Sequence, residues 1–329
     1  MVQYGRESFL PAAVCPDIPV PEIHLENGVM ILNQLKSMRR GCTRIGFALL
    51  GYLAAAYLCV YVLEIVAYWF WPESLLDMNF LMVLSDVSTY GVGALVFWLI
   101  LEPLPTAAAP QRSMTPVRFS KLLIEAIGVM YSASLLTSLI IAVISVLTGQ
   151  ELTNILSDTV DTMSVGSMFF FTVIVAPICE ELIFRGILFR RLLPMGQKFA
   201  IVISALAFGL YHCNLYQFFY ATAIGLLFGC IVAKTGRIRY TIVLHAILNF
   251  LGSVLVTILE PYPNLSVAYT VIIYLLMLLG LFILAFDFRS LTPAAPCLPG
   301  CWKAARTSPG MIICFLVMAA MSISVVFLI

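Results

Sequence analysis

The sequence predicts an all-α fold, a polytopic bundle of about eight or nine transmembrane helices. Its 329 residues are 62% hydrophobic and only 11% charged, whereas soluble domains average about 25% charged residues. Several apolar runs exceed the roughly 18 residues that indicate a membrane-spanning helix. A net charge of +1 creates no field that would favour nucleic acid as a partner. We therefore expect a lipid bilayer, and no nucleic acid, as a partner.

Nine apolar segments are the expected spans. They cover residues 45–70, 80–101, 122–147, 165–189, 199–213, 216–233, 241–258, 266–286 and 311–329. Basic residues cluster before the first span and after the second, fourth, sixth and eighth spans, and the other loops are acidic or uncharged. This positive-inside pattern predicts a multi-pass protein of the cell membrane with its N-terminus in the cytoplasm.

Loop composition divides the chain into four blocks. They are a cytoplasmic N-terminal segment (1–44) in which 29–38 could form an interfacial helix, two peripheral transmembrane helices with a Pro-rich loop (45–118), a catalytic transmembrane core (119–288), and a loop with a C-terminal transmembrane helix (289–329). The loops 103–117 and 290–310 are rich in proline, alanine and serine. We expect both to be flexible connectors.

Ionisable side chains inside spans are costly and mark functional sites by default. The spans contain Glu64, Asp86, Glu125, Glu180, Glu181, Arg185, His212 and His245. The first three have a simple structural interpretation, since Glu64 is isolated and the other two lie near span ends. The remaining five cluster in three motifs.

The fourth span carries two adjacent glutamates, which point about 100° apart on a helix and cannot share one role. Glu181 and Arg185 are four residues apart, so they lie on one face and can form an ion pair. Glu180 then has no partner on its own helix, which suits a general base or acid. The alternative is that both glutamates merely bind Arg185 or neighbouring helices.

Two histidines and an asparagine complete the candidate set. His212 follows Phe208 by one helical turn and could meet Glu180 across a helix interface. His245 and Asn249 are four residues apart and can point at one spot, and both are donors of the kind that stabilise an oxyanion. A carboxylate, two imidazoles and an amide can activate a water and hold a tetrahedral intermediate. These residues predict an intramembrane endopeptidase.

Three motifs in this order on separate spans, over roughly residues 120–258, resemble the CPBP family. They are Glu-Glu-x-x-x-Arg (180–185), Phe-x-x-x-His (208–212) and His-x-x-x-Asn (245–249). The family includes the type II CAAX prenyl endopeptidases and the bacterial Abi proteins linked to bacteriocin immunity. The resemblance implies three pairs of roles: Glu180 and His212 activate the attacking water, His245 and Asn249 form the oxyanion hole, and Glu181 and Arg185 support them.

The site could also hold a divalent metal such as Zn²⁺. Glu180, His212 and His245 would be a legitimate three-ligand zinc set with one open position. However, the chain has no His-Glu-x-x-His helix, and a His245 nitrogen bound to metal could not serve the oxyanion. We therefore favour the metal-free mechanism. Cys297 and Cys301 share a loop without a histidine, and we expect free thiols there.

Upright helices would not bring the candidate residues together. Counted from the basic loops at about 1.5 Å per residue, Glu180 lies roughly 15 Å deep, His245 under about 10 Å and His212 near 20 Å. Helix tilt, or a later start for the fifth span, would close the gap. We expect the site to open toward the cytoplasmic half.

Two other functions fit the composition. One is a non-catalytic membrane protein, either an immunity factor that binds a bacteriocin-like peptide or a scaffold that binds a partner. The other is a transporter whose buried carboxylates relay protons, which would be expected to show an internal repeat and paired broken helices. The sequence shows neither feature, and it retains every residue of the three motifs.

Overall fold

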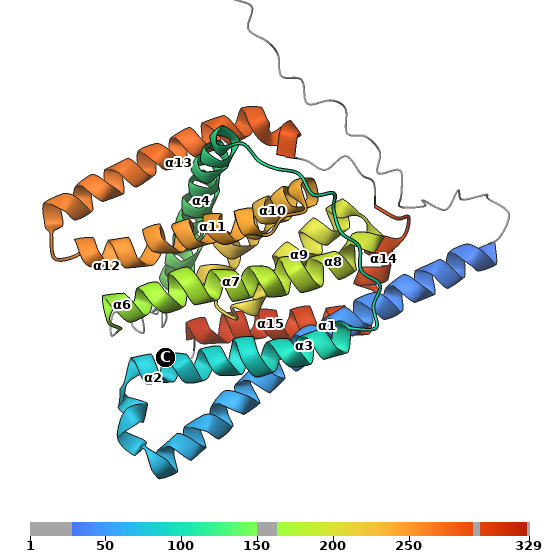
Figure 1. Ribbon diagram of the computed structural model, residues 1–329, viewed down its shortest axis with the longest axis horizontal. Coiled ribbons are helices and arrows are strands. Elements are labelled where there is room, and N and C mark those ends of the chain that lie inside the picture. Colours follow the sequence, from blue (N-terminus) through green and yellow to red (C-terminus); the bar gives the residue numbers. More distant parts are fainter. Residues whose placement is uncertain (1–27, 150–162, 292–296, 328–329) are drawn as a thin grey trace, which may run out of the picture.

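The computed structural model describes residues 28–149, 163–291 and 297–327, and its regular elements within these ranges are all helical (Figure 1). The predicted all-α fold is therefore confirmed. The elements are α1 (Gly28–Phe70), η1 (Pro72–Leu76), α2 (Met78–Asp86), η2 (Val87–Gly93), α3 (Ala94–Leu101), α4 (Pro116–Thr148), α6 (Val165–Met168), η3 (Phe169–Val175), α7 (Ala176–Glu181), η4 (Leu182–Leu188), α8 (Phe189–Leu192), η5 (Leu193–Met195), α9 (Gln197–Tyr211), α10 (Leu215–Thr235), α11 (Arg239–Asn249), η6 (Phe250–Val254), α12 (Leu255–Leu259), α13 (Pro263–Leu291), α14 (Cys301–Arg306) and α15 (Pro309–Phe327).

Within the described ranges, seven helical segments are long and apolar enough to cross a membrane. They are Leu32–Phe70, Met78–Leu101, Pro116–Thr148, Val165–Met195, Leu215–Thr235, Arg239–Leu259 and Pro263–Leu291. The fifth and ninth predicted spans coincide with shorter apolar helices, Gln197–Tyr211 and Pro309–Ser324. The polytopic bundle is confirmed, and the expected count of eight or nine spans depends on these two shorter helices.

The first span is longer than the sequence suggested. Residues 29–38, considered above as a separate interfacial helix, belong to α1, which runs for 43 residues without interruption. No proline lies between Gly28 and Phe70 to break the helix. In Figure 1 the blue end of α1 extends well beyond the neighbouring helices.

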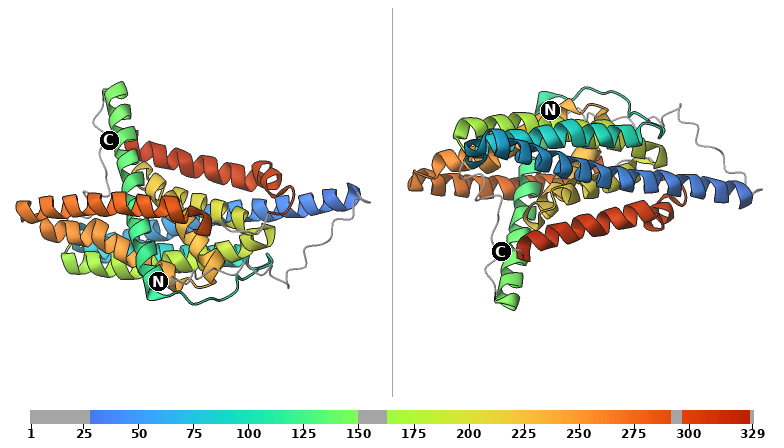
Figure 2. Two further views of the ribbon diagram at one scale, coloured as in Figure 1. Left: turned by 90° about the horizontal axis from the view of Figure 1, so that it is seen from above. Right: turned by 90° about the horizontal axis from the view of Figure 1, so that it is seen from below.

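Most helices run along the long axis of the molecule, whereas α4 crosses them steeply (Figures 1 and 2). α4 packs against α10 and α13. The crossing with α13 is close because glycines meet there: a Cβ added at Gly280 would lie 2.1 Å from the Ile124 carbonyl oxygen, and one at Gly128 would lie 2.8 Å from the Gly280 backbone. Only glycine permits this approach of two helix backbones.

The loop after α3 is fastened to the bundle, which differs from the flexible connector expected from its composition. Its Ala107 amide donates to the Arg190 carbonyl at 2.8 Å, and its Arg112 amide donates to the Thr235 carbonyl at 2.8 Å. Gly236 has a φ of +64°, and a Cβ there would lie 2.5 Å from the Ala109 carbonyl oxygen. The path of this loop therefore requires a glycine at position 236. In the second predicted connector, residues 292–296 lie outside the described part.

Contacts join the basic loops to one another. Besides the two bonds of the α3–α4 loop, the Leu298 amide donates to the Met195 carbonyl at 3.0 Å, and Arg39 Nε donates to the Thr307 carbonyl at 2.8 Å. The loops that the charge pattern assigns to one side of the membrane therefore gather at one end of the bundle. Which side of a membrane this end faces stays a prediction.

Candidate active site

The fourth predicted span supplies a buried ion pair. Glu181 and Arg185 are 0% and 1% exposed, and Arg185 Nη1 lies 3.2 Å from Glu181 Oε1. The pair predicted from their spacing is therefore present. The guanidinium also lies over the Phe208 ring, 4.4 Å from its centroid, an arrangement that stabilises a desolvated cation. Glu180 on the same short helix is 6% exposed.

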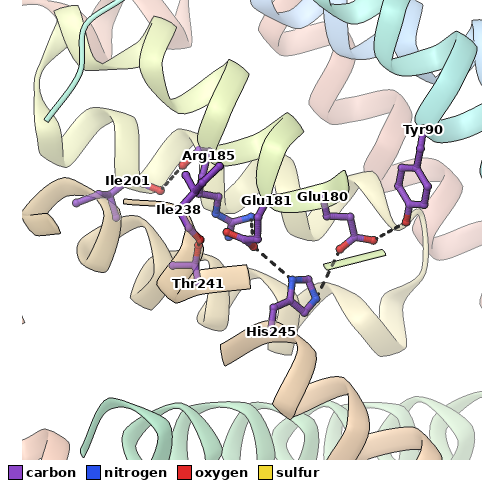
Figure 3. Close-up of polar contacts among 9 residues, drawn as sticks. Tyr90, Glu180, Glu181, Arg185, Ile201, Ile238, Thr241 and His245 are labelled. Atoms are coloured by element: carbon purple, nitrogen blue, oxygen red, sulfur yellow. Dashed lines mark hydrogen bonds and ion pairs between the residues drawn. The ribbon is translucent and has the colours of Figure 1, made fainter. Parts of the chain in front are cut away.

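His245 of α11 lies between the two glutamates (Figure 3). Its Nδ1 is 3.3 Å from Glu181 Oε1, and its Nε2 is 3.7 Å from Glu180 Oε2. An ionised carboxylate only accepts hydrogen bonds, so Nδ1 carries the proton in the contact with Glu181. The second distance is too long for a direct hydrogen bond. Glu181 thus orients the ring, and Nε2 faces Glu180 across a short gap.

Glu180 has a partner that the sequence did not reveal. The Tyr90 hydroxyl donates to Glu180 Oε1 at 3.0 Å (Figure 3). Tyr90 lies in η2, within the two-helix block that the sequence marked as peripheral. A tyrosine in an apolar run carries no sequence signal of this role, so sequence reasoning could not have found it. The bond fixes one carboxylate oxygen and leaves the other facing His245.

His212 lies at the edge of this group. It follows the last residue of α9, is half-buried, and contacts the Phe208 ring with a centroid separation of 5.1 Å. Phe208 also contacts His245 at 5.9 Å, so one aromatic ring joins both imidazoles. His212 is within electrostatic range of Glu180. Among the described residues, no hydrogen bond joins these two side chains.

Asn249 donates to a backbone carbonyl that a proline leaves without a helical donor. In the π-helical turn η3 the Ala176 amide donates to the Phe171 carbonyl, five residues back. The same pattern would pair the Thr172 carbonyl with residue 177, but Pro177 has no N–H. Asn249 Nδ2 donates to that carbonyl instead, at 2.8 Å. The amide therefore fastens α11 to η3, and one of its two N–H groups remains for a further acceptor.

Two π-helical turns flank the glutamates. η3 precedes α7 and η4 follows it. Such turns are frequent at functional sites because they redirect side chains without ending the helix. Here they set the directions in which the two glutamates and Arg185 leave the fourth span.

The buried charges can balance within the group. Glu180 and Glu181 bring two negative charges, and Arg185 brings one positive charge. The set is neutral when His245 carries a proton on both nitrogens, and buried charges are tolerated only when compensated. Both imidazole nitrogens would then be donors.

The proposed zinc set does not assemble in this structure. Among the described residues, no three His, Cys, Asp or Glu side chains lie close enough together to hold a metal ion. We therefore route no chemical step through a metal. Cys297 and Cys301 are free thiols, as expected.

The other ionisable residues of the spans take different places. Glu125 is fully buried in α4, 3.9 Å from Arg118 Nη1. Glu64 is half-buried in α1. Asp86 lies one turn before Tyr90, and its Oδ2 is buried without a hydrogen-bond partner among the described residues.

A multi-pass membrane helix bundle with a buried group of two carboxylates, an arginine and a histidine is the class of protein that this geometry defines. Comparison with known families agrees: residues 162–251 match the family model "Type II CAAX prenyl endopeptidase Rce1-like". This segment contains all six predicted site residues. It does not reach Tyr90.

The chain is also similar to part of a bacterial protein. Over 92 residues, 28% of this chain, the sequence is 39% identical to "Putative membrane peptidase YdiL" of Bacillus subtilis (strain 168), and the match spans 37% of that relative's length. No solved structure matches the chain. The two sequence matches support the resemblance to CPBP-family proteases, which is thereby confirmed for this segment.

Proposed function

We propose that this chain is an intramembrane endopeptidase that hydrolyses a peptide bond of a membrane-associated protein or peptide. One observation supports the proposal above the others. Glu180, Glu181, Arg185 and His245, which come from two separate spans, converge in a buried group with His245 facing both carboxylates. A purely structural ion pair needs only one of these carboxylates.

In the proposed mechanism, Glu180 is the general base. Its Oε1 is held by Tyr90, so Oε2 is the oxygen that takes a proton from water. At their separation of 3.7 Å, Oε2 and His245 Nε2 form no direct hydrogen bond. A water molecule commonly bridges polar groups at such a distance. The hydroxide adds to the carbonyl carbon, and the carbonyl electron pair moves to oxygen. The oxyanion electron pair then re-forms the carbonyl, the C–N bond breaks, and Glu180 returns the proton to the leaving amine.

The oxyanion formed in this step requires donors. We assign them to His245 Nε2–H and to the second N–H of Asn249, since the first is engaged by Thr172. Removing one such donor typically slows catalysis by about 10²–10³-fold. Glu181 and Arg185 support His245 by fixing the proton on Nδ1. His212 at the edge of the site would orient the attacking water together with Glu180.

The test is cleavage of a peptide library by the full chain purified in detergent. The variants are Glu180→Gln, which keeps the shape and removes the base, and His245→Gln. Glu64→Gln, a half-buried carboxylate in α1 away from the site, is the matched control. Parent and control should cleave, and both site variants should lose at least about 10²-fold in kcat/KM.

Two results would change the interpretation. If neither the parent nor any variant cleaves a peptide although all forms are folded, the result would favour the non-catalytic immunity or scaffold function. A parent activity that a chelator abolishes and Zn²⁺ restores would overturn the metal-free mechanism while keeping the endopeptidase. Measuring how accessible the N-terminal segment is to an added protease in proteoliposomes would test the predicted cytoplasmic N-terminus.

A further inference from the structure

A cavity lined by Arg185 lies outside the candidate active site, since none of the other site residues lines it. It has a volume of about 460 Å³, within the range of small-ligand pockets. Its walls come from the α3–α4 loop, from η4 and α8, and from the turn between α10 and α11. The arginines among its lining residues are Arg185, Arg190, Arg237 and Arg239, and the lining contains no aspartate or glutamate.

Three of these arginines lack a counter-charge. Arg185 is compensated by Glu181, but Arg190, Arg237 and Arg239 form no ion pair among the described residues. The Nε of Arg237 is buried and has no hydrogen-bond partner. Arg239 is held in place by its neighbour, since Nη2 donates to the Tyr240 hydroxyl at 3.1 Å. Uncompensated cations around one cavity favour an anionic occupant.

The backbone adds to this preference. α11, a helix of 11 residues, begins at Arg239, and its N-cap residue Ile238 provides no capping side chain. Both residues line the cavity. The first N–H groups of the helix and the positive end of its dipole therefore lie beside the same space.

We propose that this cavity binds the phosphate of an anionic phospholipid headgroup. The guanidinium group of arginine binds two phosphate oxygens through two parallel hydrogen bonds. Three arginines without a counter-charge supply more such donors than one carboxylate can accept. The cavity opens at the end of the bundle where the basic loops gather, which places it at headgroup level if the charge pattern holds. Basic pockets between transmembrane helices at that level bind such headgroups. The site is independent of the proposed peptidase function.

The α3–α4 loop forms one wall of this cavity. The α3–α4 loop contributes Ala108 and Ala109 to the wall, and its bonds to Arg190 and Thr235 hold it there. Gly236 allows the loop to approach the turn between α10 and α11, since a Cβ there would lie 2.5 Å from the Ala109 carbonyl oxygen. The loop and the arginine-bearing turn are therefore held against each other. The cavity is thus preformed.

The test measures the thermal midpoint Tm of the full chain in a neutral detergent as phosphatidylglycerol is added. We expect a saturable rise in Tm with phosphatidylglycerol and none with phosphatidylcholine. In Arg190→Gln/Arg237→Gln the half-saturating concentration should rise about tenfold or more, because both side chains line the cavity and their paired hydrogen bonds to the phosphate would be lost. Lys36→Gln/Arg40→Gln, two exposed positions of α1, removes the same charge elsewhere and should leave it within about twofold.

Free inorganic phosphate distinguishes the source of the ligand. If phosphate alone raises Tm and competes with the lipid, the cavity recognises phosphate as such. If only the lipid acts, the headgroup in its bilayer setting is the ligand. An equal response of the pocket variant and the parent, or an equal loss in the α1 variant, would overturn the proposal. Should the double variant fail to fold, Arg237→Lys keeps the charge, and an unchanged affinity there would also overturn it.

Discussion

Arg185→Met is the substitution whose consequence follows most directly from the structure. The guanidinium is fully buried, 3.2 Å from Glu181 Oε1 and over the face of Phe208. Methionine fills most of the same volume without charge. Glu181 would keep its contact with His245 Nδ1 at 3.3 Å but lose its cationic partner. The variant therefore leaves a buried carboxylate poorly compensated while disturbing the packing little.

The size of the effect can be worked from these contacts. Breaking a buried ion pair by removing one partner costs about 3–5 kcal/mol, and a desolvated cation–π contact is worth about 2 kcal/mol. The two overlap, so we expect a loss of about 3–5 kcal/mol in the free energy of unfolding. Glu181→Gln/Arg185→Met removes both charges, and the glutamine oxygen can still accept from His245. Its loss should be only about 1–2 kcal/mol, because no buried charge is left unpaired.

The assay is reversible unfolding in mixed detergent micelles, applied to the parent, both single variants and the double variant. The double variant should recover roughly 2–3 kcal/mol relative to Arg185→Met, which is the difference between the two expected losses. Arg190→Met, an exposed arginine one turn further on, is the control and should stay within about 0.5 kcal/mol. A loss below about 1 kcal/mol in Arg185→Met, or a double variant as unstable as the single one, would refute the reasoning.

Two further predictions concern the supports of the site. Tyr90→Phe removes the donor to Glu180 Oε1 and should lower kcat/KM about 10-fold to 100-fold with the fold intact, since hydrogen bonds to charged groups contribute about 1.5–3 kcal/mol; unchanged kinetics would remove Tyr90 from the site. Asn249→Leu should cost about 1–3 kcal/mol of stability because the Thr172 carbonyl loses its donor. Pro177→Ala in the same chain restores a backbone N–H there and should recover part of that loss, and no recovery would contradict the explanation.

The spans and the Glu181–Arg185 pair could be predicted from the sequence because both follow from local rules. An apolar run of sufficient length has few alternatives to a membrane helix, and residues four apart on a helix meet whatever surrounds them. The predicted spans accordingly lie on observed apolar helices. The role of residues 29–38 was less well determined, since nothing in the sequence separated an interfacial helix from the start of α1.

The meeting of His245 with the glutamates was harder to foresee. The depth count treated every span as an upright, regular α-helix, and on that basis His245 and Glu180 differed by about 5 Å or more. The fourth span contains the π turns η3 and η4, and α4 crosses the other helices steeply (Figure 2). Neither feature follows from hydropathy. The partner of Asn249, in contrast, had a sequence signal in Pro177, since a proline inside a span frees a carbonyl that must find another donor.

Arg185 belongs to both charged systems described above. Its Nη1 lies 3.2 Å from Glu181 Oε1, none of its three guanidinium nitrogens has a hydrogen-bond partner among the described residues, and the residue also lines the arginine cavity. None of the other site residues lines the cavity, so the proposed catalysis does not require a bound lipid. The cavity keeps its uncompensated arginines whether or not Glu180 acts as a base. Each proposal can therefore fail alone, and Arg185, common to both, is the residue to leave unchanged when either is tested.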